Sequence, residues 1–139
     1  MLKIAYHPIY KYPLPEGHRF PMEKYDLLPQ QLLYEGTCVL ENFFEPEIPN
    51  NKHFFTVHEP EYFFELLNIT LSQKAARKIG FPLSEVLIER EMIIADGTMK
   101  ASKFALENGI AMKTFVMLDY FILFMVMIVL QLKLKQIEK

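Results

Sequence analysis

Two short runs in the first third of the chain have the residue spacing of β-strands. Residues 2–6 alternate so that Leu2, Ile4 and Tyr6 share one face. Residues 37–44 combine β-branched and aromatic side chains, a mixture that is typical of strands. The pattern therefore predicts one strand at the start of the chain and a second one after the first helices.

Prolines and glycines divide the neighbouring sequence into predicted helices. Pro21 suits the first turn of a helix, because its missing N–H would have no partner there. Pro29 would break a continuous helix at a cost of about 3 kcal/mol, so we expect one helix over residues 21–27 and another from Pro29 to Gly36. A further helix is expected to begin at Pro60. The leucines expected to face the core from the helix after Pro29 are Leu28, Leu32 and Leu33.

Three more helices are predicted in the second half of the chain. Ser72 is a suitable N-cap and Gly80 a suitable end for a short one. Residues 85–95 predict a longer helix, and Asp96-Gly97-Thr98 is expected to end it before another helix over residues 99–108. The core residues expected from the helix over 85–95 are Leu87, Ile88 and Ile94.

The most suggestive chemistry lies in the loop before Pro21. Pro15-Glu16-Gly17 predicts a turn, and His18 and Arg19 follow it directly. Such a loop would present an imidazole and a guanidinium beside the start of a helix. A guanidinium can hold a carboxylate through two parallel hydrogen bonds. Two interpretations stay open at this point, a ligand-binding site and an ordinary surface pair.

Composition narrows the classes of function. The 139 residues suit a single domain, and their net charge of −2 lacks the basic excess that is typical of nucleic-acid binding. We therefore expect no nucleic-acid partner. The one cysteine, Cys38, excludes an internal disulfide and favours a reducing, cytoplasmic compartment. We expect it to be a small buried residue and not a nucleophile.

Several stretches of the first 112 residues occur in an order that one enzyme family shares. They are Tyr6-His7-Pro8, Gly17-His18-Arg19-Phe20-Pro21 continuing to Tyr25, 28–36, 57–62, 78–82, Gly97-Thr98 with Ala101, and 105–112. Each motif alone is common, whereas their shared order and spacing are specific. In these stretches the chain resembles the zinc-dependent histone deacetylases, in particular bacterial members similar to the class IV enzymes.

The resemblance implies both a fold and an activity. The fold would be α/β, the first part of an arginase/deacetylase-like domain in which helices flank a parallel sheet. The activity of the complete family would be hydrolysis of the amide of acetyl-lysine or a related acetylamine. Arg19 would lie in an inner channel beneath the metal, although a buried guanidinium that holds loop carbonyls is an equally open alternative. The other implied channel residues are His18, Phe20 and Pro21, and the implied structural motif positions are His58, Tyr62, Gly97 and Thr98.

The resemblance stops at Met112. Family members continue with the catalytic histidine pair, the zinc ligands and a tyrosine, whereas residues 113–139 contain no histidine. The four histidines before that point lack a metal-site spacing. We therefore predict no catalytic residue, metal ligand or cofactor in this chain, which would be inactive alone, although zinc is implied for the complete family. The predicted organisation is a deacetylase-like part, residues 1–112, and an unrelated tail, residues 113–139, for which a frameshift or rearrangement is our hypothesis.

The tail also suggests an alternative function. Residues 114–132 number 19, and only Thr114, Asp119 and Gln131 among them are polar. This length approaches the roughly 20 residues of a membrane-spanning helix, but an aspartate inside the bilayer costs about 2.5–3.5 kcal/mol. The alternative is a small single-pass membrane or interaction protein that is anchored through residues 114–132.

Overall fold

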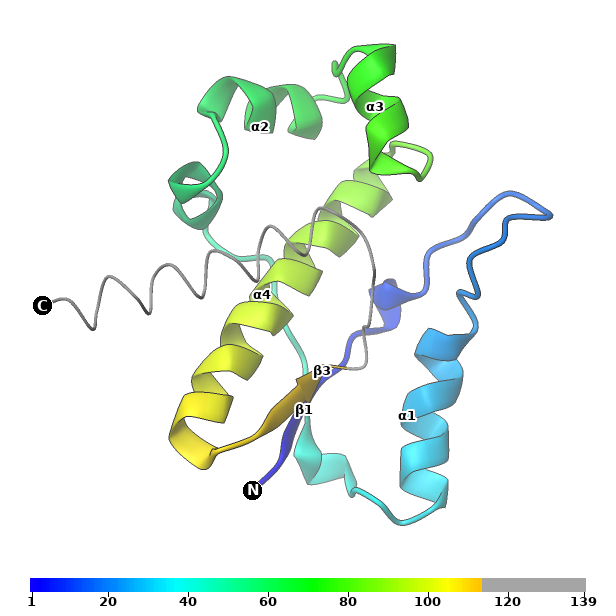
Figure 1. Ribbon diagram of the computed structural model, residues 1–139, viewed down its shortest axis with the longest axis vertical. Helices are drawn as coiled ribbons and strands as arrows, with labels where there is room; N and C mark the ends of the chain where they lie inside the picture. Colours follow the sequence, from blue (N-terminus) through cyan, green and yellow to red (C-terminus); the bar gives the residue numbers. More distant parts are fainter. Residues whose placement is uncertain (114–139) are drawn as a thin grey trace, which may run out of the picture.

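The computed structural model describes residues 1–113, which form a small parallel sheet with flanking helices (Figure 1). The strands are β1 (Lys3–Ala5), β2 (Phe43–Phe44) and β3 (Ala111–Lys113). They pair in parallel in the order β2-β1-β3, so that Ile4 of β1 lies opposite both Phe43 and Met112. The predicted α/β class is confirmed at this level, and both Ile4 and Ala5 of the central strand are buried.

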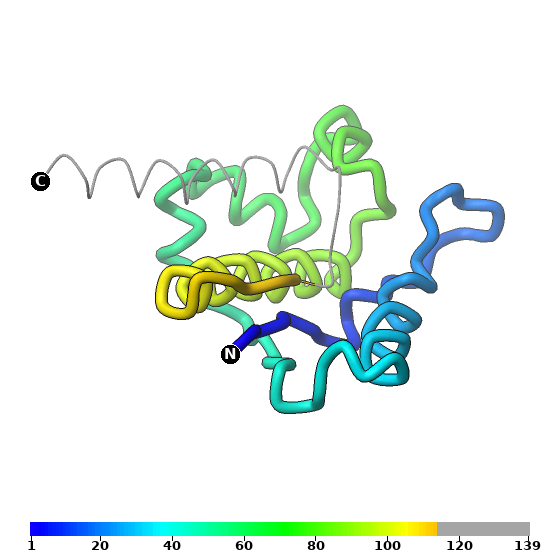
Figure 2. Tube along the Cα trace, turned by 60° about the horizontal axis from the view of Figure 1, so that its bottom comes forward, coloured from blue at the N-terminus to red at the C-terminus, as the bar shows by residue number. Residues whose placement is uncertain are grey.

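Four α-helices and three 3-10 turns connect these strands. The helices are α1 (Lys24–Tyr34), α2 (Pro60–Leu67), α3 (Gln73–Ile79) and α4 (Glu85–Asn108), and the turns are Pro8–Tyr10, Leu40–Asn42 and Asn51–Thr56. Helix α4 packs against β1 and β3. Figure 2 shows α2 and α3 on one side of α4 and β1 on the other. The long helix therefore forms the wall between the sheet and the two short helices.

Helix α4 also supplies residues to both hydrophobic clusters of the described chain. One cluster joins it to the first turn and α1, and the other joins it to α2 and the turn before α2. The predicted core residues of this helix are buried in these clusters, Leu87 and Ile94 in the first and Ile88 in the second. The shared helix makes the two clusters parts of one folded unit.

Helix α1 corrects the prediction of two helices around Pro29. It runs unbroken from Lys24 to Tyr34 with Pro29 in its interior. The proline ring is buried, and the apolar surface that it removes from water offsets the missing backbone hydrogen bond. Residues 21–23 form turns before the helix begins. Tyr25 joins Pro29 on the buried face, whereas Leu28 is 39% exposed, so the predicted leucine stripe was wrong at this position.

Helix α4 corrects the predicted break at Asp96-Gly97-Thr98. The helix continues through all three residues to Asn108. A Cβ atom at Gly97 would lie 2.6 Å from the Tyr10 hydroxyl, 3.0 Å from Cγ of Pro46 and 3.4 Å from Cβ of Ala5. The glycine is therefore required for close packing of the helix, and it does not mark a turn. Its permissive backbone, the basis of the prediction, is not used here.

The predicted strand over residues 37–44 is shorter than expected. Only Phe43–Phe44 pairs with β1, because Leu40–Asn42 forms a 3-10 turn. The Asn42 side chain fixes this turn, since its Oδ1 accepts a hydrogen bond from the Val39 amide at 2.8 Å and its Nδ2 donates to the Leu2 carbonyl at 2.8 Å. Cys38, just before the turn, is buried as predicted.

The local signals at helix ends were more reliable. Ser72 caps α3 by accepting a hydrogen bond from the Ala75 amide at 3.3 Å, and Gly80 ends that helix with φ of +81°. Pro60 occupies the first turn of α2. Gly36 follows α1 with φ of +69°, a backbone conformation that favours glycine.

No helix within residues 1–113 is both long enough and apolar enough to cross a membrane. The predicted tail, 113–139, overlaps this part only at Lys113, and the predicted anchor, 114–132, lies outside the described residues.

Candidate functional site

The loop that contains His18 and Arg19 folds into a compact turn. The His18 amide donates to the Pro15 carbonyl at 3.1 Å, and Nδ1 of the same histidine accepts a hydrogen bond from the Phe20 amide at 3.2 Å. His18, Arg19 and Pro21 are exposed, whereas Phe20 is half-buried. Arg19 makes no hydrogen bond or ion pair within residues 1–113, so these residues do not form the buried, carbonyl-holding guanidinium of the alternative interpretation. Its role in an inner channel stays a prediction.

Phe81 connects this loop to the segment between α3 and α4. The Phe81 ring lies with its centroid 5.6 Å from that of His18 and 5.6 Å from that of Phe20, edge-on to the latter. The Phe20 ring stacks on Tyr25 at 6.1 Å, and Nζ of Lys24 lies 4.5 Å from the centre of the Phe20 ring. Two segments about sixty residues apart therefore meet through one aromatic cluster.

A cavity of about 540 Å³ lies behind Phe81, between α2, α3 and the start of α4. Its size falls within the range of small-molecule sites. The walls are mainly apolar and include Tyr62, Leu66, Ile79, Phe81, Leu87 and Ile88. Lys74, Lys78 and Glu91 add charged groups to the same lining.

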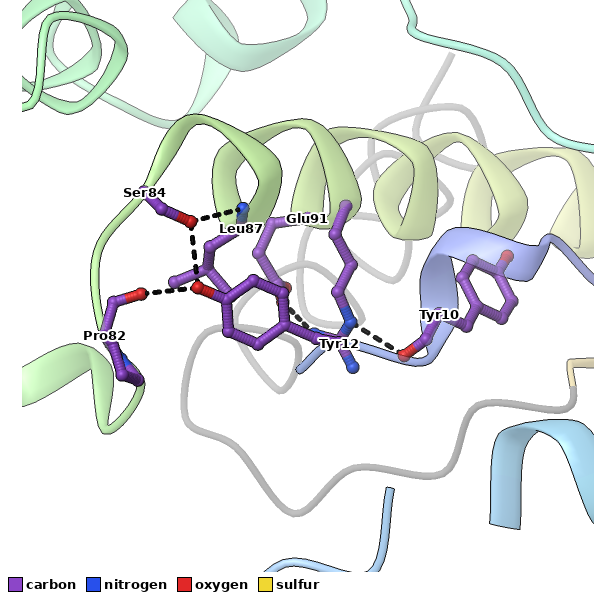
Figure 3. A network of polar contacts seen from close by, with 7 residues as sticks. Tyr10, Tyr12, Pro82, Ser84, Leu87 and Glu91 are labelled. Atoms are coloured by element: carbon purple, nitrogen blue, oxygen red, sulfur yellow. Dashed lines mark hydrogen bonds and ion pairs between the residues drawn. The ribbon is translucent and has the colours of Figure 1, made fainter. Parts of the chain in front are cut away.

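A fully buried arginine anchors the first turn to α4. Arg90 is 0% exposed, and its Nε donates a hydrogen bond to the Tyr10 carbonyl at 2.9 Å, while one terminal nitrogen forms an ion pair with Glu91 (Figure 3). Its guanidinium carbon lies 5.6 Å from the centre of the Tyr25 ring. Burial of a charge is tolerated only with such partners. Sequence reasoning missed this residue, although a charge three positions after Leu87 on a buried helical face was an available signal.

A second polar group in Figure 3 holds the start of α4. The Tyr12 hydroxyl donates to the Pro82 carbonyl at 3.0 Å and lies 2.8 Å from Oγ of Ser84. The same Ser84 oxygen caps the helix by accepting a hydrogen bond from the Leu87 amide at 3.1 Å. These bonds fix the segment that carries Phe81 relative to the start of the chain.

Lys113 lies at the carboxyl end of β3, where open α/β sheets commonly bind ligands. Its Nζ donates a hydrogen bond to Oγ1 of Thr98 at 2.7 Å, and Thr98 in turn donates to the Ile94 carbonyl at 2.9 Å. Burial lowers the pKa of Lys113 to about 8, with Arg90 acting in the same direction and Glu91 against it. The predicted motif residue Thr98 therefore links α4 to this lysine.

His58 and Tyr62, the other predicted structural positions, lie together at the start of α2. Their ring centroids are 5.7 Å apart, and the His58 amide donates to the Phe54 carbonyl at 2.8 Å. Burial lowers the pKa of His58 and raises that of Tyr62. Glu59 is the N-cap residue of α2, so capping by His58 was not the arrangement formed. Tyr62 instead contributes to the cavity wall.

The described residues do not fit a catalytic zinc site. Such a site takes three protein ligands, and residues 1–113 contain no group of three histidine, cysteine, aspartate or glutamate side chains placed to hold a metal. Two histidines serve local turns: Nδ1 of His7 accepts a hydrogen bond from the Ile9 amide at 3.0 Å, and His18 holds Phe20. His7 also pairs with Glu45 at 3.3 Å.

Comparison with known proteins identifies a longer relative. No family model matches the chain. An uncharacterized protein of Picosynechococcus sp. (strain PCC 7002) is 40% identical to it over 111 residues, which are 80% of this chain. The chain spans 37% of the length of that relative. Its similarity therefore extends over a length close to that of the described residues, within a protein that is much longer.

Proposed function

We propose that residues 1–112 correspond to the N-terminal part of a zinc-dependent deacetylase-like hydrolase, and that these 139 residues alone do not catalyse the reaction. The observation that carries the proposal is the contact of His18 and Phe20 with Phe81. These residues belong to two separate motifs of the resemblance, 17–25 and 78–82. Motifs that come from a common pocket wall are expected to meet in space in this way.

The α/β arrangement supports the same proposal. A parallel sheet of order β2-β1-β3 with α4 packed on it suits the first part of an arginase/deacetylase-like domain. The greater length of the Picosynechococcus relative is consistent with a complete protein that has further elements. Its substrate would be acetyl-lysine or a related acetylamine, and the single cysteine favours a cytoplasmic location.

The chemistry explains why residues 1–113 would be insufficient. Hydrolysis of an amide requires an activated water, a base that takes its proton and donors that hold the oxyanion. Zinc would supply the water activation in the complete protein, held by residues outside this part of the chain. The contribution of residues 1–112 would be the channel wall, with Arg19 placed to bind the released acetate through its planar fork.

A parallel assay of two proteins tests the activity. The Picosynechococcus relative and the 139-residue chain are purified with zinc and incubated with acetyl-lysine peptides and acetylated polyamines, and free acetate is measured. We expect acetate release by the relative alone. Release by the 139-residue chain, or a relative that is inactive on every substrate and binds no zinc, would overturn the proposal.

A substitution in the relative tests the proposed channel residue. Replacement of the residue aligned with Arg19 by alanine is expected to slow acetate release while the thermal transition of the protein is retained. Unchanged kinetics in a folded variant would remove the assigned role of this position.

The second candidate is a membrane or interaction protein, which the apolar composition of residues 114–132 favours. Cell fractionation separates the two. Recovery of the chain with membranes after an alkaline wash supports an anchor, whereas recovery in inclusion bodies supports an incomplete hydrolase domain. The nucleotide sequence after the Met112 codon tests the frameshift hypothesis, since an alternate frame without a histidine pair would end it.

A further inference from the structure

The cavity between α2, α3 and α4 combines an apolar interior with a positively charged rim. Tyr62 and Phe81 contribute aromatic rings to the walls, and Leu66, Ile79 and Leu87 contribute aliphatic surface. A volume of about 540 Å³ is sufficient for the apolar body of a small molecule. The interior therefore suits a ring-containing or branched apolar group.

The charges at the rim have one sign on the α3 side. Lys74 and Lys78 both line the cavity and are exposed, and they are separated by one turn of α3. Residues 68–84 contain these two lysines and Arg77 but no acidic side chain. Neither Lys74 nor Lys78 takes part in an ion pair within residues 1–113.

The one acidic group of the lining does not cancel this charge. Glu91 is already paired with the buried Arg90 on α4. The two lysines are therefore the charged groups of the lining that stay available to a ligand. An apolar cavity with two such cations at its edge is complementary to a molecule that is apolar at one end and anionic at the other.

We propose that this cavity binds a small amphiphilic anion, whose apolar body lies between Tyr62, Phe81 and the aliphatic wall and whose acidic group contacts Lys74 and Lys78. The site is independent of the proposed hydrolase activity, because none of these contacts uses a metal or a residue beyond 113. Its occupant is defined by chemistry, a carboxylate or sulfonate that is attached to an aromatic or branched apolar group.

Titration with anilinonaphthalene sulfonate, an aromatic anion that fluoresces in apolar surroundings, tests the site in the 139-residue chain. We expect saturable binding with one molecule per chain. The double variant K74E/K78E converts two attractions into repulsions and is expected to weaken binding about tenfold. The matched control, K52E/K103E, makes the same change of charge at two exposed lysines outside the cavity lining and should leave the dissociation constant within about twofold.

A second variant tests the interior separately from the charge. Ala75 lines the cavity, so Ala75→Leu places extra carbon atoms in it and should also weaken binding while retaining the thermal transition. If K74E/K78E loses the thermal transition, the Ala75→Leu result decides. Equal binding by wild type and Ala75→Leu, equal binding by the two charge variants when both are folded, or fluorescence that does not saturate would overturn the proposal.

Discussion

Gly97→Ala tests the packing of α4 against the sheet more sharply than any other single change. The added methyl group would lie 2.6 Å from the Tyr10 hydroxyl and 3.0 Å from Cγ of Pro46. Tyr10 and Pro46 are both fully buried, so neither side chain can rotate into solvent to relieve the contact. Either these side chains or the helix must move.

The size of the effect follows from two opposing contributions. Excess volume in a packed core costs about 1–3 kcal/mol, whereas replacement of a helical glycine by alanine gains about 1 kcal/mol of helix propensity. Because the contacts come from two elements on the same side of the helix, we expect the cost to dominate, with a net loss of about 1–2 kcal/mol. This loss corresponds to a decrease of Tm of roughly 3–10 °C for a domain of this size.

Thermal unfolding followed by circular dichroism measures the change. Lys103→Ala, at an exposed position of the same helix, is the control and should change stability by less than about 0.5 kcal/mol. Tyr10→Phe removes the hydroxyl that the new methyl group meets, so the double variant should lose less stability than the sum of the two single variants. A Gly97→Ala protein that is more stable than wild type would refute the close approach of α4 to Tyr10 and Pro46.

Two further changes test other contacts of the structure. Ser84→Ala removes the N-cap of α4 and a partner of the Tyr12 hydroxyl, and we expect a loss of about 1–2 kcal/mol in urea unfolding; Ser72→Ala, at the exposed cap of the short α3, should cost less, and equal losses would contradict the role of the Tyr12 contact. For Lys113, the pKa is about 8 in the folded chain and 10.5 in the unfolded chain, so the unfolded state binds more protons between these values and stability should rise with pH by up to about 3 kcal/mol. Burial raises the pKa of Tyr10, which opposes this gain only above pH of about 10, and Lys113→Met should flatten the rise; a wild-type profile that falls between pH 8 and 10 would contradict the buried lysine.

Local sequence signals predicted the ends of several elements correctly. Ser72, Gly80 and Pro60 occupy the cap, end and first-turn positions that their chemistry favours. These positions depend on hydrogen bonds and dihedral angles within a few residues, which the sequence displays directly. The apolar spacing within residues 85–95 likewise identified its buried side chains.

The two incorrect helix breaks have a tertiary cause. Pro29 and Gly97 disfavour helices locally, and both nevertheless lie inside helices where the chain packs closely. Propensity gave the wrong result because burial of the proline ring and the approach of Tyr10 to Gly97 are contacts between distant segments. A single sequence does not reveal which residue will face such a contact.

The candidate site was visible in the sequence only in part. The His18-Arg19-Phe20 motif was identified, but its partner Phe81 and the buried Arg90 were not singled out. The lowered pKa of Lys113 was also hidden, because it results from burial that the fold creates. Contacts between elements decide all three features, and residue spacing along the chain carries no direct record of them.

A chimera provides the most direct test of the proposal that residues 1–112 form the wall of a deacetylase-type pocket. Residues 1–112 are joined to the part of the Picosynechococcus relative that follows its matched segment, and zinc content and acetate release are measured together. We predict stoichiometric zinc and release of acetate from an acetylated lysine or acetylamine, both absent from the 139-residue chain. A folded chimera that binds zinc but releases no acetate, while the intact relative does, would contradict this role of residues 1–112.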